Sequence, residues 1–151
     1  DLEGLRVNRI GEGTLRFIGC RISKGSYVKG IYWEKPANLF CDTCTIDVGE
    51  KPFCDVGAYT LKNFRFEGCT VTGKGELLAL TDLRPQPTDS LPATIAISNC
   101  TISVAASPAV AVKWGAQSAK AVTVTCANNK PKGARLLEAK AFPKTWKLDV
   151  K

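Results

Sequence analysis

Two acidic side chains are the best candidates for catalysis in this sequence of 151 residues. The chain has no histidine, so nucleophile systems that pair serine or cysteine with histidine are excluded within it. Asp42 and Glu67 stand two residues before Cys44 and Cys69 in two similar phrases. We therefore expect them on neighbouring strands, about 4.8 Å apart. Two carboxylates that close raise the pKa of one of them, as an acid and nucleophile pair requires.

Other interpretations of these acids stay open. Arg65 lies between them in sequence and could neutralise both as an ordinary surface cluster. In a lyase, Lys29 or Arg65 could instead be the base that removes the proton beside a uronate carboxylate. No acidic cluster that would bind calcium for such a reaction stands out in the sequence.

The best candidate for ligand binding is an aromatic and basic segment between residues 22 and 39. Its members are Tyr27, Lys29, Tyr32, Trp33 and Lys35. Aromatic faces beside hydrogen-bonding cations are typical of sites that hold sugars. Alternatively, Trp33 and one tyrosine fill the core beneath a strand.

A repeated phrase must position these residues. Its template is apolar-x-apolar-x-x-Cys-x-apolar, and its cysteines are Cys20, Cys44, Cys69, Cys100 and Cys126. The steps between these cysteines are 24, 25, 31 and 26 residues, a period typical of stacked repeats. Apolar residues alternate before each cysteine, which predicts strands. The three-residue step to the cysteine then requires a bend if both flanking strands face inward.

The residue before the cysteine is the expected bend. It is Gly19, Gly68 and Asn99 in three copies, residue types that tolerate the left-handed conformation. Thr43 departs from this pattern, and the copy at 122–126 is one residue short, so we expect the bend to be lost there. A third apolar segment follows in each repeat, at 31–33, 56–58, 78–80 and 110–112.

Phrases such as Ile-Ser-Asn-Cys-Thr-Ile-Ser at 97–103 resemble the coils of pectin-lyase-like parallel β-helix proteins, which include pectate lyases, polygalacturonases and phage tailspikes. The resemblance covers about residues 5 to 126. It implies an all-β, right-handed parallel β-helix of about five coils over 1–126, with a C-terminal cap over 127–151. It also implies a polysaccharide partner and, for a spike, a homotrimer. The activity stays open, since one fold hosts many functions.

The chain has seven cysteines, and five of them are expected to form an interior ladder. Parallel side chains on adjacent rungs do not turn toward each other easily, so we expect free thiols and folding in a reducing cytoplasm. Cys41-Asp-Thr-Cys44 with Cys54 could suggest zinc or redox chemistry. A zinc site needs four ligands, and the repeat already explains Cys41 and Cys44, so we expect no metal and no cofactor.

The net charge of +7, from 21 basic and 14 acidic residues, could attract acidic glycans, nucleic acid or an anionic membrane. The basic residues are mostly scattered, so an ordinary soluble surface with excess lysine explains the charge as well. No nucleic-acid motif and no apolar run near the roughly 20 residues of a membrane span is present, so we expect neither partner. Residues 1–13 supply one strand, over 5–10, and no lid, so we expect further polypeptide or a partner chain over that end. Three prolines in 82–92 predict a surface loop.

The leading interpretation is a β-helix module of a phage tailspike or cell-surface protein, on a virion or an extracellular surface. It would be a rigid scaffold that contacts acidic polysaccharide. One alternative is a polysaccharide-degrading hydrolase or lyase, and another is a structural interaction protein that never touches sugar. An exposed groove around Tyr27 to Lys35 would favour the first two, and Asp42 paired with Glu67 in an open cleft would favour the enzyme.

Overall fold

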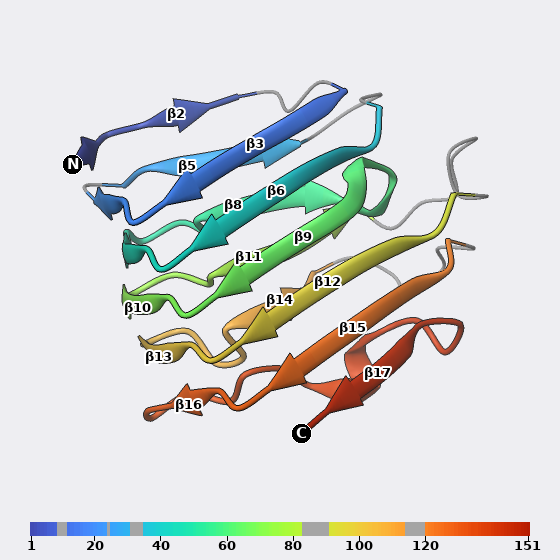
Figure 1. Cartoon of the computed structure of the whole chain (residues 1–151). Helices are drawn as coiled ribbons and strands as arrows, with labels where there is room; N and C mark the ends of the chain where they lie inside the picture. Colours follow the sequence, from blue (N-terminus) through green and yellow to red (C-terminus); the bar gives the residue numbers. More distant parts are fainter. Residues whose placement is uncertain (9–11, 24, 31–34, 83–90, 114–119) are drawn as a thin grey trace.

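Three parallel β-sheets run the length of the molecule, and each turn of the chain contributes a short strand to each of them (Figure 1). The structure is a computed structural model that describes residues 1–8, 12–23, 25–30, 35–82, 91–113 and 120–151. Each strand pairs in parallel with the strand one turn before it and one turn after it. This arrangement is a parallel β-solenoid of about five turns, which confirms the predicted all-β, parallel β-helix class.

The strands of each sheet follow one another in chain order. Sheet A contains β1 (Leu2–Glu3), β4 (Arg21–Ser23), β7 (Thr45–Val48), β10 (Thr70–Gly73), β13 (Thr101–Val104) and β16 (Lys130–Pro131). Sheet B contains β2 (Arg6–Val7), β5 (Tyr27–Gly30), β8 (Cys54–Gly57), β11 (Leu78–Asp82) and β14 (Val110–Val112). Sheet C contains β3 (Gly13–Ile18), β6 (Ala37–Asp42), β9 (Leu61–Glu67), β12 (Ala93–Ser98), β15 (Val122–Ala127) and β17 (Lys147–Val150). Short 3-10 helices lie at Ala58–Thr60 (η1) and Ala139–Ala141 (η3). The described part of the chain holds no helix with the length and apolarity needed to cross a bilayer.

Both ends differ in detail from the sequence-based expectation. Of the single strand predicted over 5–10, residues 6 and 7 form β2, and residues 9 and 10 lie outside the described residues. A further short strand, β1, precedes it and belongs to a different sheet. The segment 127–151, predicted as a cap, supplies β16 and β17 and a bridge from Leu137 to Val110. It therefore extends all three sheets by one more turn.

The core is a set of apolar columns that run along the solenoid. In sheet C, Leu39, Phe64, Ile95 and Val124 stand in register, and none is more than 1% exposed. Because the side chains alternate, the residues between them point outward and are partly exposed. The period-2 pattern in the sequence therefore separates the packed interior from the surface.

A sharp bend separates sheet C from sheet A in every turn. Its residues, Gly19, Thr43, Gly68, Asn99 and Asn128, all have φ between 54° and 61°. Three of these five bends were predicted. The expectation that the last copy loses its bend is wrong, because Asn128, two residues beyond Cys126, adopts the same conformation.

The residue after each bend forms an interior column. Cys20, Cys44, Cys69 and Cys100 occupy it as predicted, but the fifth member is Asn129. Cys126 stands instead in register with Ile97, on the strand before the bend. The predicted ladder therefore holds four of its five cysteines. Cys126 matched the sequence template because a cysteine side chain is apolar enough for the strand column before the bend as well as for the bend column.

Thr43 gives a stability prediction, because a β-branched side chain is strained in the left-handed region. Its hydroxyl donates to the carbonyl oxygen of Asp42 at 2.7 Å, which compensates for part of the strain. We expect Thr43→Asn to raise the free energy of unfolding by about 1 kcal/mol, since asparagine tolerates this conformation. Urea denaturation measures the change. Thr70→Asn, in an extended strand, is the matched control and should not stabilise the protein. A destabilised Thr43→Asn variant would contradict the assignment.

Candidate functional site

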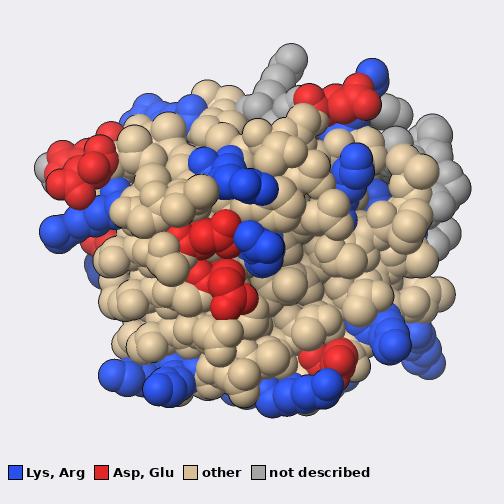
Figure 2. All heavy atoms as spheres, in the orientation of Figure 1, with Lys and Arg blue, Asp and Glu red and all other residues tan. Residues whose placement is uncertain are grey.

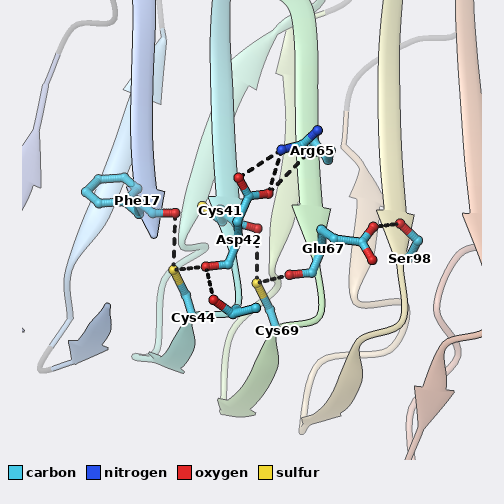
Figure 3. Close-up of polar contacts among 9 residues, drawn as sticks. Phe17, Cys41, Asp42, Cys44, Arg65, Glu67, Cys69 and Ser98 are labelled. Atoms are coloured by element: carbon cyan, nitrogen blue, oxygen red, sulfur yellow. Dashed lines mark hydrogen bonds and ion pairs between the residues drawn. The ribbon is translucent and has the colours of Figure 1, made fainter. Parts of the chain in front are cut away.

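The thiols at the bend bind the backbone of two successive turns (Figure 3). Cys69 Sγ donates toward the carbonyl oxygen of Cys41 at 3.2 Å and lies 3.5 Å from that of Glu67. Cys44 and Cys100 make the equivalent pairs of contacts. The bend interrupts the regular ladder of backbone hydrogen bonds. Each thiol therefore bonds to backbone carbonyl groups that lie beside the bend.

Asn129 takes the same role in the last bend. Its Nδ2 donates to the carbonyl oxygen of Ile97 at 2.7 Å, and its Oδ1 accepts from the amide of Cys100 at 3.0 Å. One turn earlier, Cys100 Sγ accepts from the amide of Cys69 at 3.4 Å. The column therefore requires a buried side chain that both donates and accepts, rather than a cysteine as such.

Burial raises the pKa of most of the buried thiols, whereas the hydrogen bond with Cys69 lowers the pKa of Cys100. Burial raises the pKa of Cys44 to about 11 and that of Cys126 to about 11. The pKa of Cys41 and of Cys54 is raised well above its usual value by burial, and that of Cys69 by its bond with Cys100 and by burial. All seven cysteines are free thiols. Among the described residues, no three Cys, Asp or Glu side chains are grouped to hold a metal ion. The role that the contacts show for the column is structural, since its thiols bond to the backbone at the bends.

Asp42 and Glu67 are register partners on the outward face of β6 and β9, as their spacing predicts. Each carboxylate is nevertheless occupied (Figure 3). Arg65 donates from Nη2 to both oxygens of Asp42 at 2.8 Å and from Nε to one of them at 3.1 Å. Glu67 accepts hydrogen bonds from the hydroxyl of Ser98 and from Asn99 Nδ2.

The partners of Glu67 favour its ionised form. The hydrogen bonds from Ser98 and Asn99 lower the pKa of Glu67, and Arg65 adds to the effect. A general acid needs the opposite, a carboxyl group that keeps its proton near neutral pH. The pair has the predicted position, but its surroundings do not supply the proton donor that glycoside hydrolysis needs.

The rest of this outward face is an ordered polar surface. Phe40 lies between Arg16 and Arg65, whose guanidinium carbons are 5.0 and 5.1 Å from the ring centroid. A ladder of hydrogen-bonded side chains runs beside it, through Thr14, Asn38, Asn63 and Thr94. Figure 2 shows a small cluster of both charges near the middle of this face, with uncharged surface around it.

Tyr27 lines a hollow where the chain turns from sheet A into sheet B. The hollow measures about 410 Å³, and its lining is Arg6, Gly25, Ser26, Tyr27, Glu50, Lys51 and Pro52. The Tyr27 hydroxyl donates to Asn8 Oδ1 at 2.8 Å, and Lys29 Nζ lies 5.1 Å from the ring centroid. An aromatic ring and cationic side chains from three successive turns therefore meet at one concave place.

Buried Ser26 fixes this corner. Its hydroxyl donates to the carbonyl oxygen of Ser23 at 2.6 Å and accepts from the amide of Leu5 at 3.0 Å. The amide of Tyr27 donates to the carbonyl oxygen of Leu5 at 2.8 Å. These bonds tie the Tyr27 backbone to the first turn, so the hollow is held by ordered backbone.

Of the other predicted binding residues that the structure describes, neither Lys29 nor Lys35 lines this hollow. Lys35 forms an exposed ion pair with Glu12 at 2.8 Å. Tyr32 and Trp33 lie outside the described residues. The sequence did not point to Arg6, Glu50 and Lys51 as neighbours of Tyr27. Arg6 is the register partner of Tyr27 in the preceding turn, and Glu50 and Lys51 lie just before β8 in the following turn. Finding them from sequence would have required an alignment of the segments that enter sheet B.

Thiol accessibility gives a direct test of the cysteine column. In the native protein at pH 8, we expect iodoacetamide to modify Cys20 first, because it is half-buried while the other six are buried. Cys44 and Cys69 should react only after unfolding, since burial both shields them and suppresses the thiolate. Mass spectrometry of time points, with a urea-unfolded sample as control, measures this. Rapid modification of Cys69 in the folded protein would refute the buried column.

Glu67 gives a pH prediction. Its pKa is lowered in the folded state, so its stabilising contribution is present above the usual value near 4.5 and is lost as pH falls through the folded pKa. We expect Glu67→Gln to destabilise the protein at pH 7 and to have little effect near pH 3. Urea unfolding at both pH values measures the difference. An equal loss at both pH values would show that the hydrogen bonds do not depend on the charge.

Comparison with known proteins found no matching protein family, no matching curated protein and no matching solved structure, so the function must be argued from the geometry alone.

Proposed function

We propose that this solenoid is a rigid module that contacts an acidic polysaccharide, and that the Tyr27 hollow holds one of its sugar units. The observation that carries the proposal is the meeting of the Tyr27 ring with Arg6 and Lys51 in a hollow of about 410 Å³. A hollow of this size accepts a single sugar ring, and it lies at the low end of ligand pockets.

The chemistry of the hollow suits a uronate. The Arg6 guanidinium offers a planar pair of donors that matches a carboxylate, and Lys51 adds a second cation. The Tyr27 ring offers an apolar face for the C–H side of a sugar. Glu50 can accept from sugar hydroxyls, although it also forms an exposed ion pair with Lys74 at 3.4 Å.

Binding is favoured over catalysis because Asp42 and Glu67, the carboxylate pair that the described strands place in register, are both engaged by other side chains. Asp42 is held by Arg65, and Glu67 is kept ionised by Ser98 and Asn99. Neither acid lines the hollow at Tyr27. The module would therefore hold a glycan without cleaving it.

The proposal extends to the protein's setting. A β-solenoid with a glycan-binding corner suits a phage tailspike or another protein displayed on a virion or cell surface. There it would be a stiff support, and three copies could assemble side by side as a trimer. Seven free thiols fit folding in a reducing cytoplasm before display.

Binding to polygalacturonate, measured by isothermal titration calorimetry, tests the proposal. We expect Arg6→Ala and Tyr27→Ala each to weaken binding roughly tenfold, the effect of losing about 1.4 kcal/mol. Tyr27→Phe should keep most of the affinity, because the ring remains. Lys144→Ala, which removes an exposed cation far along the chain, is the charge-matched control for Arg6→Ala.

Three results would contradict this function. Equal binding of neutral dextran would remove the role of the cations. Unchanged affinity in the Arg6 and Tyr27 variants would place the glycan elsewhere. New reducing ends, or absorbance of unsaturated products, would identify an enzyme instead of a binding module.

A further inference from the structure

Three neighbouring strands of sheet A carry outward polar side chains that bond to no other protein group. The strands are β10, β13 and β16, which follow one another at the left of Figure 1. Within the part of the chain that the structure describes, none of these side chains has a hydrogen bond or an ion pair. They are exposed or half-buried, and we call them the sheet A face: Thr70, Thr72, Thr101, Ser103, Lys130 and Lys132.

The outward side chains of sheet C are in the opposite state, because they bond to one another. Asn63 bonds to Asn38 in one neighbouring strand and to Thr94 in the other. Arg65 forms an ion pair with Asp42. A polar group that already has a protein partner must lose it before it can bind a ligand, whereas a solvated group exchanges only water. The sheet A face is therefore the better placed of the two to bind a ligand.

Ordered backbone lies beneath this face. The amide of Thr101 donates to the carbonyl oxygen of Cys69 at 2.9 Å, and the amide of Lys130 donates to that of Cys100 at 2.8 Å. The register sets Thr70, Thr101 and Lys130 in one outward column, with about 4.8 Å between successive turns. Two hydroxyls and an ammonium group therefore form a straight row along the solenoid. A ligand that lies along this row does not have to order the backbone first.

The lysines of this face belong to the most basic part of the chain. Residues 127–151 contain seven lysines and arginines and two acids, which gives +5 of the chain's total of +7. Both acids are already paired, Glu138 with Lys140 at 3.0 Å and Asp149 with Lys151 at 3.6 Å. Figure 2 shows basic side chains at the lower left, where Figure 1 places β16.

The face itself carries no acid. Following its columns back along the solenoid, the first acidic side chain is Asp47, one turn before Thr72. On sheet C, by contrast, Lys147 stands only two residues from Asp149 on the same strand. The positive charge of Lys130 and Lys132 is therefore not balanced by a neighbouring carboxylate on this face.

These groups fit a linear anion that also carries hydroxyls. A threonine hydroxyl can donate to a carboxylate or accept from a sugar hydroxyl, and a lysine ammonium supplies three donors and the charge. Single-stranded nucleic acid is held by aromatic rings on which its bases stack, and the outward positions of β10, β13 and β16 hold no aromatic residue. The same positions hold no apolar side chain that would enter a membrane. An acidic polysaccharide is the partner that uses both the hydroxyls and the cations.

We propose that the sheet A face is a second contact surface for an acidic polysaccharide, separate from the Tyr27 hollow. Lys130 and Lys132 pair with its carboxylates, and the hydroxyls of Thr70 and Thr101 bond to its sugar units. The inference rests on the partner class of the proposed function but not on the hollow. Where one polymer touches both places, the two contacts strengthen each other through effective concentration.

Isothermal titration calorimetry with polygalacturonate at low salt tests the proposal. We expect the double variant Lys130→Ala with Lys132→Ala to bind roughly fivefold more weakly, and its affinity to depend less on salt. The double variant Lys144→Ala with Lys147→Ala is the matched control, because it removes the same charge from the same segment, at and just before β17 of sheet C. The control should bind within about twofold of the wild type.

The role of the hydroxyls is tested without a change of charge. Thr101→Val keeps the β-branched shape and removes one hydroxyl, so we expect binding to weaken roughly threefold. Thr123→Val makes the same change on sheet C, at the register partner of Lys147, and should leave the affinity unchanged. Circular dichroism confirms that each variant is folded.

The Tyr27→Ala variant separates this inference from the hollow. Its amide resonances from β13 and β16 should still shift when polygalacturonate is added. If the wild type binds polygalacturonate and the Lys130 and Lys132 double variant binds it equally well, the sheet A face is wrong and the proposed function stands. If only the lysine variant loses affinity, the hollow is wrong and the sheet A face is the site. A wild type that binds no polygalacturonate overturns both. Tighter binding of single-stranded oligothymidylate than of polygalacturonate would assign the face to nucleic acid and overturn the inference.

Discussion

The bend between sheets C and A is the constraint on which the rest of the fold depends. One residue in the left-handed conformation reverses the side-chain alternation, so the strands on both sides can face the core. The next residue then bonds to the backbone of two successive turns, as Cys69 does with Cys41 and Glu67. A buried polar group without a partner is costly, so the side chain here must donate as well as pack. Cysteine and asparagine both meet this requirement, which is why Asn129 can end a column of thiols.

The same register decides what the outward surface can do. Because successive turns lie about 4.8 Å apart, side chains in one outward column always meet, whatever their function. Along sheet C these neighbours interact with one another. Arg65 forms an ion pair with Asp42, Ser98 donates a hydrogen bond to Glu67, and two arginines lie against the Phe40 ring. Where the chain leaves sheet A for sheet B, side chains from different turns surround a hollow at Tyr27. In the proposed function, the face of sheet C is therefore stabilising, and the corner at Tyr27 is a binding site.

Much of this fold could be predicted from the sequence because the repeat has a physical signature. Alternation identified the strands, the odd step identified the bend, and the register of Asp42 with Glu67 followed from both. The last turn did not match the template because Cys126 is apolar enough for the strand column, whereas the bend is formed by Asn128, two residues further on, and its polar contacts are made by Asn129. The partners of Tyr27 escaped it for a different reason. Arg6 lies in β2 as the register partner of Tyr27, 21 residues before it, and Lys51 lies in the connection before β8, so neither follows the steps of 24 to 31 residues between the template cysteines.

The sheet C side of this solenoid is finished by hydrogen-bonded ladders and ion pairs, which engage the polar side chains there with one another. The Tyr27 hollow is one small site of about 410 Å³, so in the proposed function a single module would hold its sugar weakly. Several modules displayed together would hold a long polysaccharide more firmly, because each occupied hollow raises the effective concentration of polymer at the next. A repeating polymer is then held best by repeated copies of a weak site.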